Sequence, residues 1–76
     1  MGFPEEIKRI RQRCFLTQEE FAKVINVAFT TVNRWEGGKA KPNLSAMKSI
    51  KKFCEINNIE YDDVEEAWLN FAPNKK

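Results

Sequence analysis

The chain has 76 residues with a formal net charge of +2, and 42% of the residues are hydrophobic, which fits one small domain with a modest core. It holds no histidine, the commonest general base, and we see no nucleophile–base pair and no phosphate-binding loop. We therefore expect no enzyme activity, no cofactor and no metal ion. Without a signal peptide or an apolar run of about 18 residues, the chain is expected to be cytoplasmic and not to bind a membrane.

The charges are divided unevenly along the chain. Residues 1–52 contain eleven Lys or Arg and five Asp or Glu, whereas residues 53–76 contain two Lys and six Asp or Glu. A basic body with an acidic C-terminal part indicates one face for a polyanion and another face turned away from it.

The first expected helix covers about residues 4–14. Pro4 suits a first helical position, and Glu5 and Glu6 complement the positive end of the helix dipole. Apolar residues then recur at i, i+3 and i+7, as one buried face requires: Ile7, Ile10 and Cys14. The basic residues lie mostly off that face and either are simply solvated or contact phosphates: Lys8, Arg9, Arg11 and Arg13.

Residues 17–36 are predicted to form two helices with a tight turn between them. Thr17 and Glu20 form the T-x-x-E pattern of a capping box that starts the first helix, whose apolar residues are Phe21, Ala22, Val24 and Ile25. Asn26 tolerates the left-handed conformation that ends a helix, and the second helix ends at Glu36. A helix, a turn of about three or four residues and a second helix make a helix-turn-helix unit.

The second of these helices has two faces. Val32 and Trp35 lie three residues apart and define the inward direction. At about 100° per residue, the outward face carries Thr30, Asn33 and Arg34, with Phe29 and Thr31 on its flanks. Such side chains form ordinary solvated surfaces, but their hydroxyl, amide, guanidinium and methyl groups also read base edges in a DNA major groove. Within a helix-turn-helix unit we interpret this face as one that reads DNA.

Several of these features together resemble one known family. The family pattern is matched by Arg11, by TQEEFA at 17–22, by TVNRWEGGK at 31–39 and by Pro42. In this combination the chain resembles the phage repressor and Cro-like helix-turn-helix family, often called the XRE family, over about residues 5–59. The resemblance implies an all-α, five-helix DNA-binding domain whose third helix enters the major groove of double-stranded DNA.

The resemblance also implies roles for single residues. In the family, an arginine on the first helix pairs with a glutamate at the end of the third, which implies an Arg11–Glu36 pair. Gln18 lies where family members contact a phosphate and brace the base-reading side chains. Two positions depart from the family pattern: Asn26 stands in place of the usual glycine, and Ala28 in place of the usual Ser or Thr cap, at a cost of about 1 kcal/mol.

The predicted DNA contacts form two groups. Base edges are assigned to the outward face and to the start of the preceding helix: Phe29, Thr30, Asn33, Arg34 and Gln18. Phosphates are assigned to the side chains around them: Arg11, Arg13, Thr31, Lys39 and Lys41. The two lysines lie in the loop after Gly37 and Gly38, which end the recognition helix, and their alternative is a flexible, solvated lysine.

The segment after Pro42 is predicted to be a helix capped by Asn43. Its core stripe is predicted to hold Leu44, Met47, Ile50 and Cys54, widened by Phe53. Asn57 and Asn58 end this helix, and Ile59 folds back as a hydrophobic follower. The two cysteines, Cys14 and Cys54, lack the spacing of a metal site and fall at apolar positions, which predicts buried free thiols in a reducing compartment.

The last helix is expected over about residues 63–71, started by a second capping box from Asp62 and Glu65 and followed by a frayed tail at 72–76. Its apolar stripe is Val64, Ala67, Trp68 and Phe71. Domains of this kind usually pair on half-sites about 34 Å apart, and the candidate contact for a homodimer is Trp68, Leu69 and Phe71. The alternative is that these rings cap the one hydrophobic core.

The sequence therefore predicts sequence-specific binding of double-stranded DNA and transcriptional regulation, with a repressor favoured over an activator. Two alternatives stay open. One is an antitoxin or another protein-interaction module whose last helix binds a toxin or a different protein, against which salt-dependent DNA binding would argue. The other is the DNA-targeting domain of a larger enzyme such as a DNA methyltransferase, against which a complete reading frame ending at Lys76 would argue.

Overall fold

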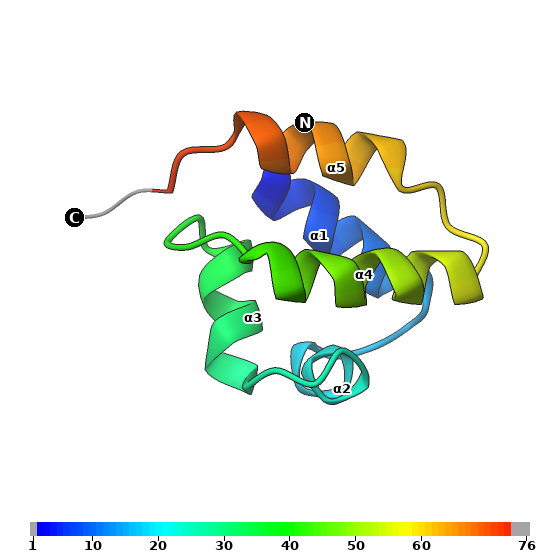
Figure 1. Ribbon diagram of the computed structural model, residues 1–76. Helices are drawn as coiled ribbons and strands as arrows, with labels where there is room; N and C mark the ends of the chain where they lie inside the picture. Colours follow the sequence, from blue (N-terminus) through cyan, green and yellow to red (C-terminus); the bar gives the residue numbers. More distant parts are fainter. Residues whose placement is uncertain (1, 74–76) are drawn as a thin grey trace.

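The computed structural model describes residues 2–73 as five helices joined by short turns, with no strand among them (Figure 1). The helices are α1 (Phe3–Arg13), α2 (Gln18–Val24), α3 (Phe29–Glu36), α4 (Leu44–Ile56) and α5 (Asp62–Asn70). The predicted all-α, five-helix class is therefore confirmed. Within the described range, no helix is long and apolar enough to cross a membrane. Of the predicted tail, residues 74–76 lie outside this range.

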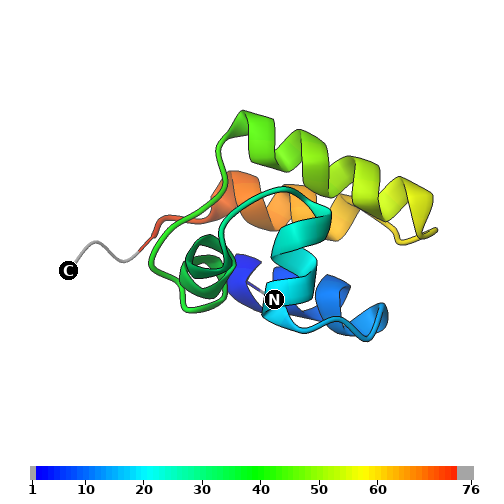
Figure 2. The ribbon, with the colours of Figure 1, turned by 90° about the horizontal axis from the view of Figure 1, so that it is seen from below.

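The helix α1 is central to the arrangement, because it packs against both α3 and α5. In Figure 1, α5 lies beside α1 at the top, α4 crosses in front, and α2 and α3 lie at the bottom. Figure 2 shows α4 along one side, whereas α3, the start of α2 and the turn between α1 and α2 lie along the other. The α2–α3 pair therefore occupies one end of the molecule and α5 the opposite end.

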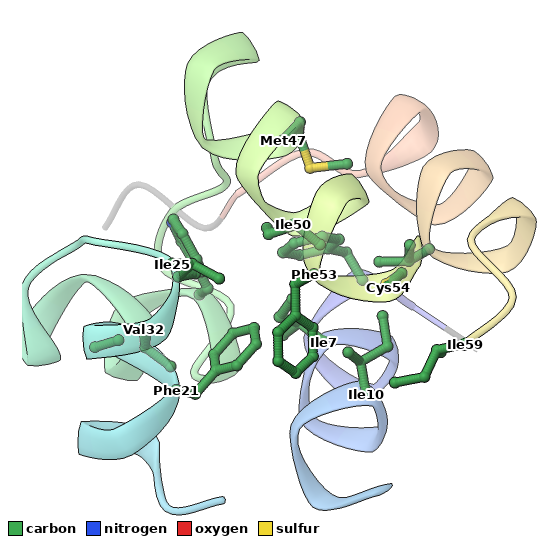
Figure 3. Close-up of a cluster of buried hydrophobic side chains, with 14 residues drawn as sticks. Ile7, Ile10, Phe21, Ile25, Val32, Met47, Ile50, Phe53, Cys54 and Ile59 are labelled. Carbon is green, nitrogen blue, oxygen red and sulfur yellow. The ribbon is translucent and has the colours of Figure 1, made fainter. Parts of the chain in front are cut away.

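One apolar core fills the space between the helices (Figure 3). Every helix contributes a fully buried side chain, and α1 contributes three: Phe3, Ile7 and Ile10. The ring of Phe21 in α2 meets that of Phe53 in α4 edge to face, with the centroids 5.2 Å apart, a geometry that adds to the gain from apolar burial. Because α1 begins at Phe3, one residue before the predicted start, the core gains an aromatic ring that the sequence analysis did not include.

Two residues predicted to lie in the core are exposed. Val24 has 57% and Leu44 has 68% of its surface accessible. Leu44 is the first residue of α4 and lies on its terminal turn, whereas Val24 lies off the face of α2 that carries the buried Phe21, Ala22 and Ile25. Periodicity correctly predicts the face of a helix, but it does not predict where along the helix the covering elements end.

The predicted helix caps at Thr17 and Asn43 are confirmed. The Thr17 hydroxyl accepts the amide of Glu20 at 3.1 Å, and the Glu20 carboxylate accepts the amide of Thr17 at 2.9 Å, which completes the capping box. The Asn43 side chain accepts an amide of the first turn of α4 at 2.9 Å. Asn26 and Asn58 end their helices with φ of 64° and 59°, a conformation that asparagine tolerates better than most residues.

The predicted capping box at the start of α5 does not form. Tyr61 takes the N-cap position with φ −100° and ψ −17°, and it makes no side-chain cap hydrogen bond. Because the backbone is already near-helical at Tyr61, Asp62 becomes the first helical residue and cannot act as the cap. The carboxylates of Asp62, Asp63 and Glu65 in this first turn instead complement the positive end of the helix dipole.

The two cysteines differ in burial. Cys54 is fully buried and Cys14 is half-buried against the same core, and both are free thiols. Burial raises the pKa of the Cys54 thiol to about 11, because the thiolate would lose its hydration in the core. The prediction of buried free thiols is thus confirmed for Cys54 and only in part for Cys14.

Lys41 is directed at the C-terminal end of α5. Its ammonium donates to the backbone carbonyls of Trp68 at 2.9 Å and Phe71 at 3.2 Å, and it lies 4.9 Å from the centroid of the Trp68 ring. The Trp68 indole in turn donates to the carbonyl of Pro42 at 2.7 Å. The predicted phosphate role of Lys41 is therefore corrected: its charge caps the negative end of a helix dipole and ties the loop after α3 to α5.

Replacing Lys41 by Met should lower the free energy of unfolding by about 1–2 kcal/mol, because two carbonyls lose a charged donor and the indole loses its cation. Urea denaturation followed by circular dichroism measures this change. The matched control is Lys39→Met, an exposed lysine of the same loop, which should change stability by less than about 0.5 kcal/mol. Equal effects of the two substitutions would contradict the capping role.

Candidate nucleic-acid interface

The turn between α2 and α3 is short and internally bonded. The amide of Val27 donates to the carbonyl of Ala22 at 2.9 Å, which closes the end of α2 around the left-handed Asn26. Ala28 has the extended backbone of an N-cap, with φ −72° and ψ 150°, but no side chain caps the first turn of α3. The missing cap at Ala28 is therefore confirmed, and α3 nevertheless starts at Phe29.

The two faces of α3 are those that the sequence predicts. Val32 and Trp35 are buried, whereas the side of α3 away from the core exposes Phe29, Thr30, Asn33 and Arg34. Thr31 is half-buried at the edge of a hollow of about 440 Å³ that it shares with Ala28 and Asn43. The structure thus brings the predicted base-reading residues of α3 onto one accessible surface, and their contacts with DNA stay a prediction.

A chain of four side chains joins α1, α2 and α3. Arg11 donates to both carboxylate oxygens of Glu36, from Nε at 2.7 Å and from Nη2 at 3.0 Å. Its Nη1 donates to the carbonyl of Leu16 at 2.8 Å. Gln18 donates from Nε2 to Glu36 at 2.9 Å, and the Gln18 oxygen accepts Nδ2 of Asn33 at 3.1 Å. The Arg11–Glu36 pair implied by the family resemblance is therefore present.

This arrangement can be compared with known proteins. A helix-turn-helix family model matches residues 7–61, which is more than half of the chain. The chain belongs to the XRE-type helix-turn-helix family. The matched range includes the whole of α2, α3 and α4, so the family assignment rests on the elements that build the exposed face of α3.

This XRE-type chain is similar to one regulator in particular, the HTH-type transcriptional activator BcrR of Enterococcus faecalis, with 36% identity over 66 residues. The match covers 87% of this chain and 32% of BcrR, so the chain spans about a third of the length of that relative. No solved structure matches the chain significantly. The family and the relative together support a role in DNA-binding transcription regulation.

Within this XRE-type domain, Arg11 has a structural role of its own. All three nitrogens of its guanidinium group donate inside the chain, and 11% of its side chain is exposed. The hydrogen bond to Glu36 raises the pKa of Arg11 above its ordinary value. Three of its five N–H groups are thus used within the chain, so Arg11 links α1 to α3 and to the start of α2, and its contact with a phosphate stays a prediction.

The accessible cations around α3 are fewer than the sequence indicates. Arg13, Arg34 and Lys39 are exposed, whereas Arg9 is paired with the buried carboxylate of Glu6 at 2.6 Å. Of the residues assigned to phosphates, Arg13 and Lys39 are exposed, Thr31 and Arg11 are partly covered, and their phosphate contacts stay predictions. Among the described residues there is also no cluster of side chains suited to a metal ion.

The sequence analysis missed one exposed residue beside this surface. Phe15 lies in the turn between α1 and α2, where 93% of its surface is accessible and its φ is 58°. It falls between two helices, so no helical periodicity assigns it to a face. Neither its exposure nor its backbone conformation follows from its residue type, because phenylalanine is usually buried and rarely left-handed.

Replacing Ala28 by Ser should stabilise the domain by about 1 kcal/mol, because the hydroxyl can accept an unpaired amide in the first turn of α3. The backbone at this position already has the conformation of a capping residue. The midpoint of urea denaturation measures the gain, and Ala72→Ser, at an exposed position outside the helices, is the control. A midpoint that does not rise would contradict the assignment of Ala28 as the weak start of α3.

Replacing Glu36 by Gln should lower the free energy of unfolding by about 2–3 kcal/mol, because the partly buried guanidinium of Arg11 loses its counter-charge. The control is Glu55→Gln, which removes a carboxylate from the exposed side of α4 and should cost less than about 0.5 kcal/mol. Thermal and urea denaturation of both variants provide the comparison. Similar costs at the two positions would show that the ion pair adds nothing beyond a surface charge.

Proposed function

We propose that this protein binds double-stranded DNA sequence-specifically by placing α3 in a major groove, and that it regulates transcription in this way. The observation that carries the proposal is the hydrogen-bonded chain from Arg11 through Glu36 and Gln18 to Asn33, which holds an exposed amide in one position. Ordering an exposed polar side chain costs conformational entropy and stabilises the fold little. A held amide next to an exposed guanidinium is suited to reading base edges.

The proposed base readers follow from the groups that α3 exposes. Arg34 can donate two hydrogen bonds to a guanine, and Asn33 can both donate to and accept from an adenine. Thr30 and Phe29 offer a hydroxyl and apolar surface, which suit a base edge and a thymine methyl or a sugar. Gln18 acts mainly through Asn33, because both its amide oxygen and its amide nitrogen already bond within the chain.

The proposed phosphate contacts are Arg13 and Lys39, with the Thr31 hydroxyl beside them. These side chains come from the end of α1, the loop after α3 and α3 itself, so they flank the recognition surface on more than one side. The acidic first turn of α5 lies at the opposite end of the molecule from α2 and α3 (Figure 1). This distribution of charge favours an approach to DNA with α3 first.

We propose repression as the mode of regulation. Repression requires only that the bound domain occupies an operator overlapping a promoter, whereas activation also requires a favourable contact with the transcription machinery. The relative BcrR is described as an activator, so the sign has to be measured on this protein. A reporter gene under a promoter that carries the selected binding site decides it: expression falls on induction of a repressor and rises on induction of an activator.

We propose that two copies pair on adjacent half-sites and that Leu69 is the contact residue. Leu69 has 63% of its surface exposed on α5. Trp68 and Phe71, the two aromatic residues of the predicted contact, are partly buried and pack against the core of the same chain. The Phe71 ring lies 6.0 Å from that of the buried Phe3, and the Trp68 indole donates to Pro42. Of the dimer contact predicted from the sequence, Leu69 is therefore the residue that we propose. A toxin that bound to α5 would find the same limited apolar surface.

Replacing Arg34 by Ala should weaken binding to the preferred sequence by about 5- to 150-fold and relax the preference at one base pair, because a guanine loses its two donors. Sites are first selected from a random duplex pool, and affinities are then measured on single-base variants at several salt concentrations. Lys39→Ala is the contrast: it should weaken all sequences alike and reduce the salt slope by about one.

The triple alanine variant of Thr30, Asn33 and Arg34 tests the base-reading assignment of α3. This variant should bind DNA with no preference for the selected sequence. An unchanged sequence preference in the triple variant would show that α3 does not read bases. Binding that is indifferent to salt would contradict the phosphate contacts, and would favour the protein-interaction alternative.

A further inference from the structure

The turn between α1 and α2 holds Phe15 in a conformation that is costly for this residue. Within residues 2–73, three residues other than glycine have positive φ, and they are Phe15 at 58°, Asn26 at 64° and Asn58 at 59°. Asparagine can offset the left-handed conformation with local hydrogen bonds of its short side chain, but phenylalanine cannot. Of the three, Phe15 is therefore the residue whose side chain does not favour the backbone conformation that it adopts.

The surrounding hydrogen bonds fix this turn and leave the ring outside. The amide of Phe15 donates to the carbonyl of Gln12 at 3.0 Å, and the amide of Leu16 donates to the carbonyl of Arg11 at 3.3 Å. The carbonyl of Leu16 accepts the Arg11 guanidinium at 2.8 Å. With the backbone held on both sides, the ring stays 93% exposed. It thus stabilises the fold neither by burial nor by conformation, and an outlier of this kind is a reason to look for function.

The position of the turn indicates what the ring meets. In Figure 2 the turn between α1 and α2 leads into the start of α2 on the same side of the molecule as α3, with α4 on the other side. Gln18, which holds Asn33 at 3.1 Å, is three residues further along the chain. Arg13, an exposed cation, is two residues before. The turn that carries Phe15 therefore adjoins the start of α2, with Arg13 and Gln18 as its near neighbours along the chain.

We infer that Phe15 packs against a deoxyribose of the DNA backbone, beside the phosphate that Arg13 contacts. This inference rests on the proposed DNA binding. The carbon face of a sugar is apolar, so covering it with the exposed ring removes apolar surface of both from water. The backbone of the turn is already held by hydrogen bonds, so only the side-chain torsions of Phe15 have to be ordered on binding. A basic neighbour favours DNA over a second copy of this domain as the occupant, because it attracts the polyanion.

The proposed contact predicts how DNA affinity should change with base sequence and with salt when the ring is lost. The sugar is the same at every base pair, so losing the ring should weaken binding to all duplexes by the same factor. The ring carries no charge and displaces no counterions, so the salt slope should stay unchanged. These two features distinguish Phe15 from Arg34, which alters base preference, and from Lys39, which alters the salt slope.

Two variants of Phe15 test the inference on the whole chain. Phe15→Gly removes the ring and suits the left-handed backbone, so its thermal midpoint should equal or exceed that of the wild type. Phe15→Ala removes the ring and keeps the backbone strain, so its midpoint should be lower than that of the glycine variant. Both variants should bind every duplex about 3- to 10-fold more weakly, with unchanged base preference and salt slope. Ile56→Ala, at an exposed apolar position on α4, should bind as the wild type does.

The outcomes separate this inference from the proposed function. Wild-type affinity in both Phe15 variants would overturn the sugar contact and leave DNA binding by α3 intact. Loss in the glycine variant alone would assign the effect to backbone freedom, and a lower salt slope would assign it to Arg13; either would overturn the contact. Sedimentation provides a further check, since reduced self-association of both variants would make a second copy the occupant. A wild type that binds no duplex would overturn the inference and the proposed function together.

Discussion

The ion pair between Arg11 and Glu36 is the interaction on which the rest of this small domain depends. Its two charges come from α1 and α3, and 11% and 5% of their side chains are exposed. A chain of 76 residues has limited apolar surface to bury, so its free energy of unfolding is small. Burying one unpaired charge would cost a large fraction of that free energy. The pair avoids this cost because each charge is satisfied by the other and by neighbours in the chain, Leu16 and Gln18.

The C-terminal end of α3, the proposed recognition helix, is held by two sets of contacts. Glu36, the last residue of α3, is bound by Arg11, and the loop that follows is bound to α5 through Lys41 and the indole of Trp68. The buried Val32 and Trp35 fix its remaining side against the core. A helix restrained in this way moves as part of a rigid body, so the proposed binding of DNA by α3 would need little additional ordering of the protein.

Features encoded within a few residues of one another could be predicted from the sequence. The caps at Thr17 and Asn43 and the left-handed Asn26 belong to this class, because donor and acceptor are close along the chain. The Arg11–Glu36 pair spans 25 positions and came from the family resemblance. Lys41 was misassigned because its partners lie 27 and 30 positions away, and a lysine in a loop carries no sign of them. The exposed Leu44 and the strained Phe15 depend on which elements lie nearby, and a one-dimensional pattern does not contain that information.

The hydrogen bonds that link Arg11, Glu36, Gln18 and Asn33 can form with only one orientation of the two side-chain amides. A guanidinium can only donate and a carboxylate can only accept, so Gln18 must turn its nitrogen towards Glu36 and its oxygen towards Asn33. Asn33 must then spend a donor on Gln18, and a flip of either amide would set like groups against each other. The pattern of donors and acceptors that Asn33 offers outward is thus decided by the carboxylate of Glu36, which acts on it through Gln18 of α2. A carboxylate at the end of α3 thereby sets, by way of a side chain on α2, which hydrogen-bonding groups the exposed face of its own helix presents.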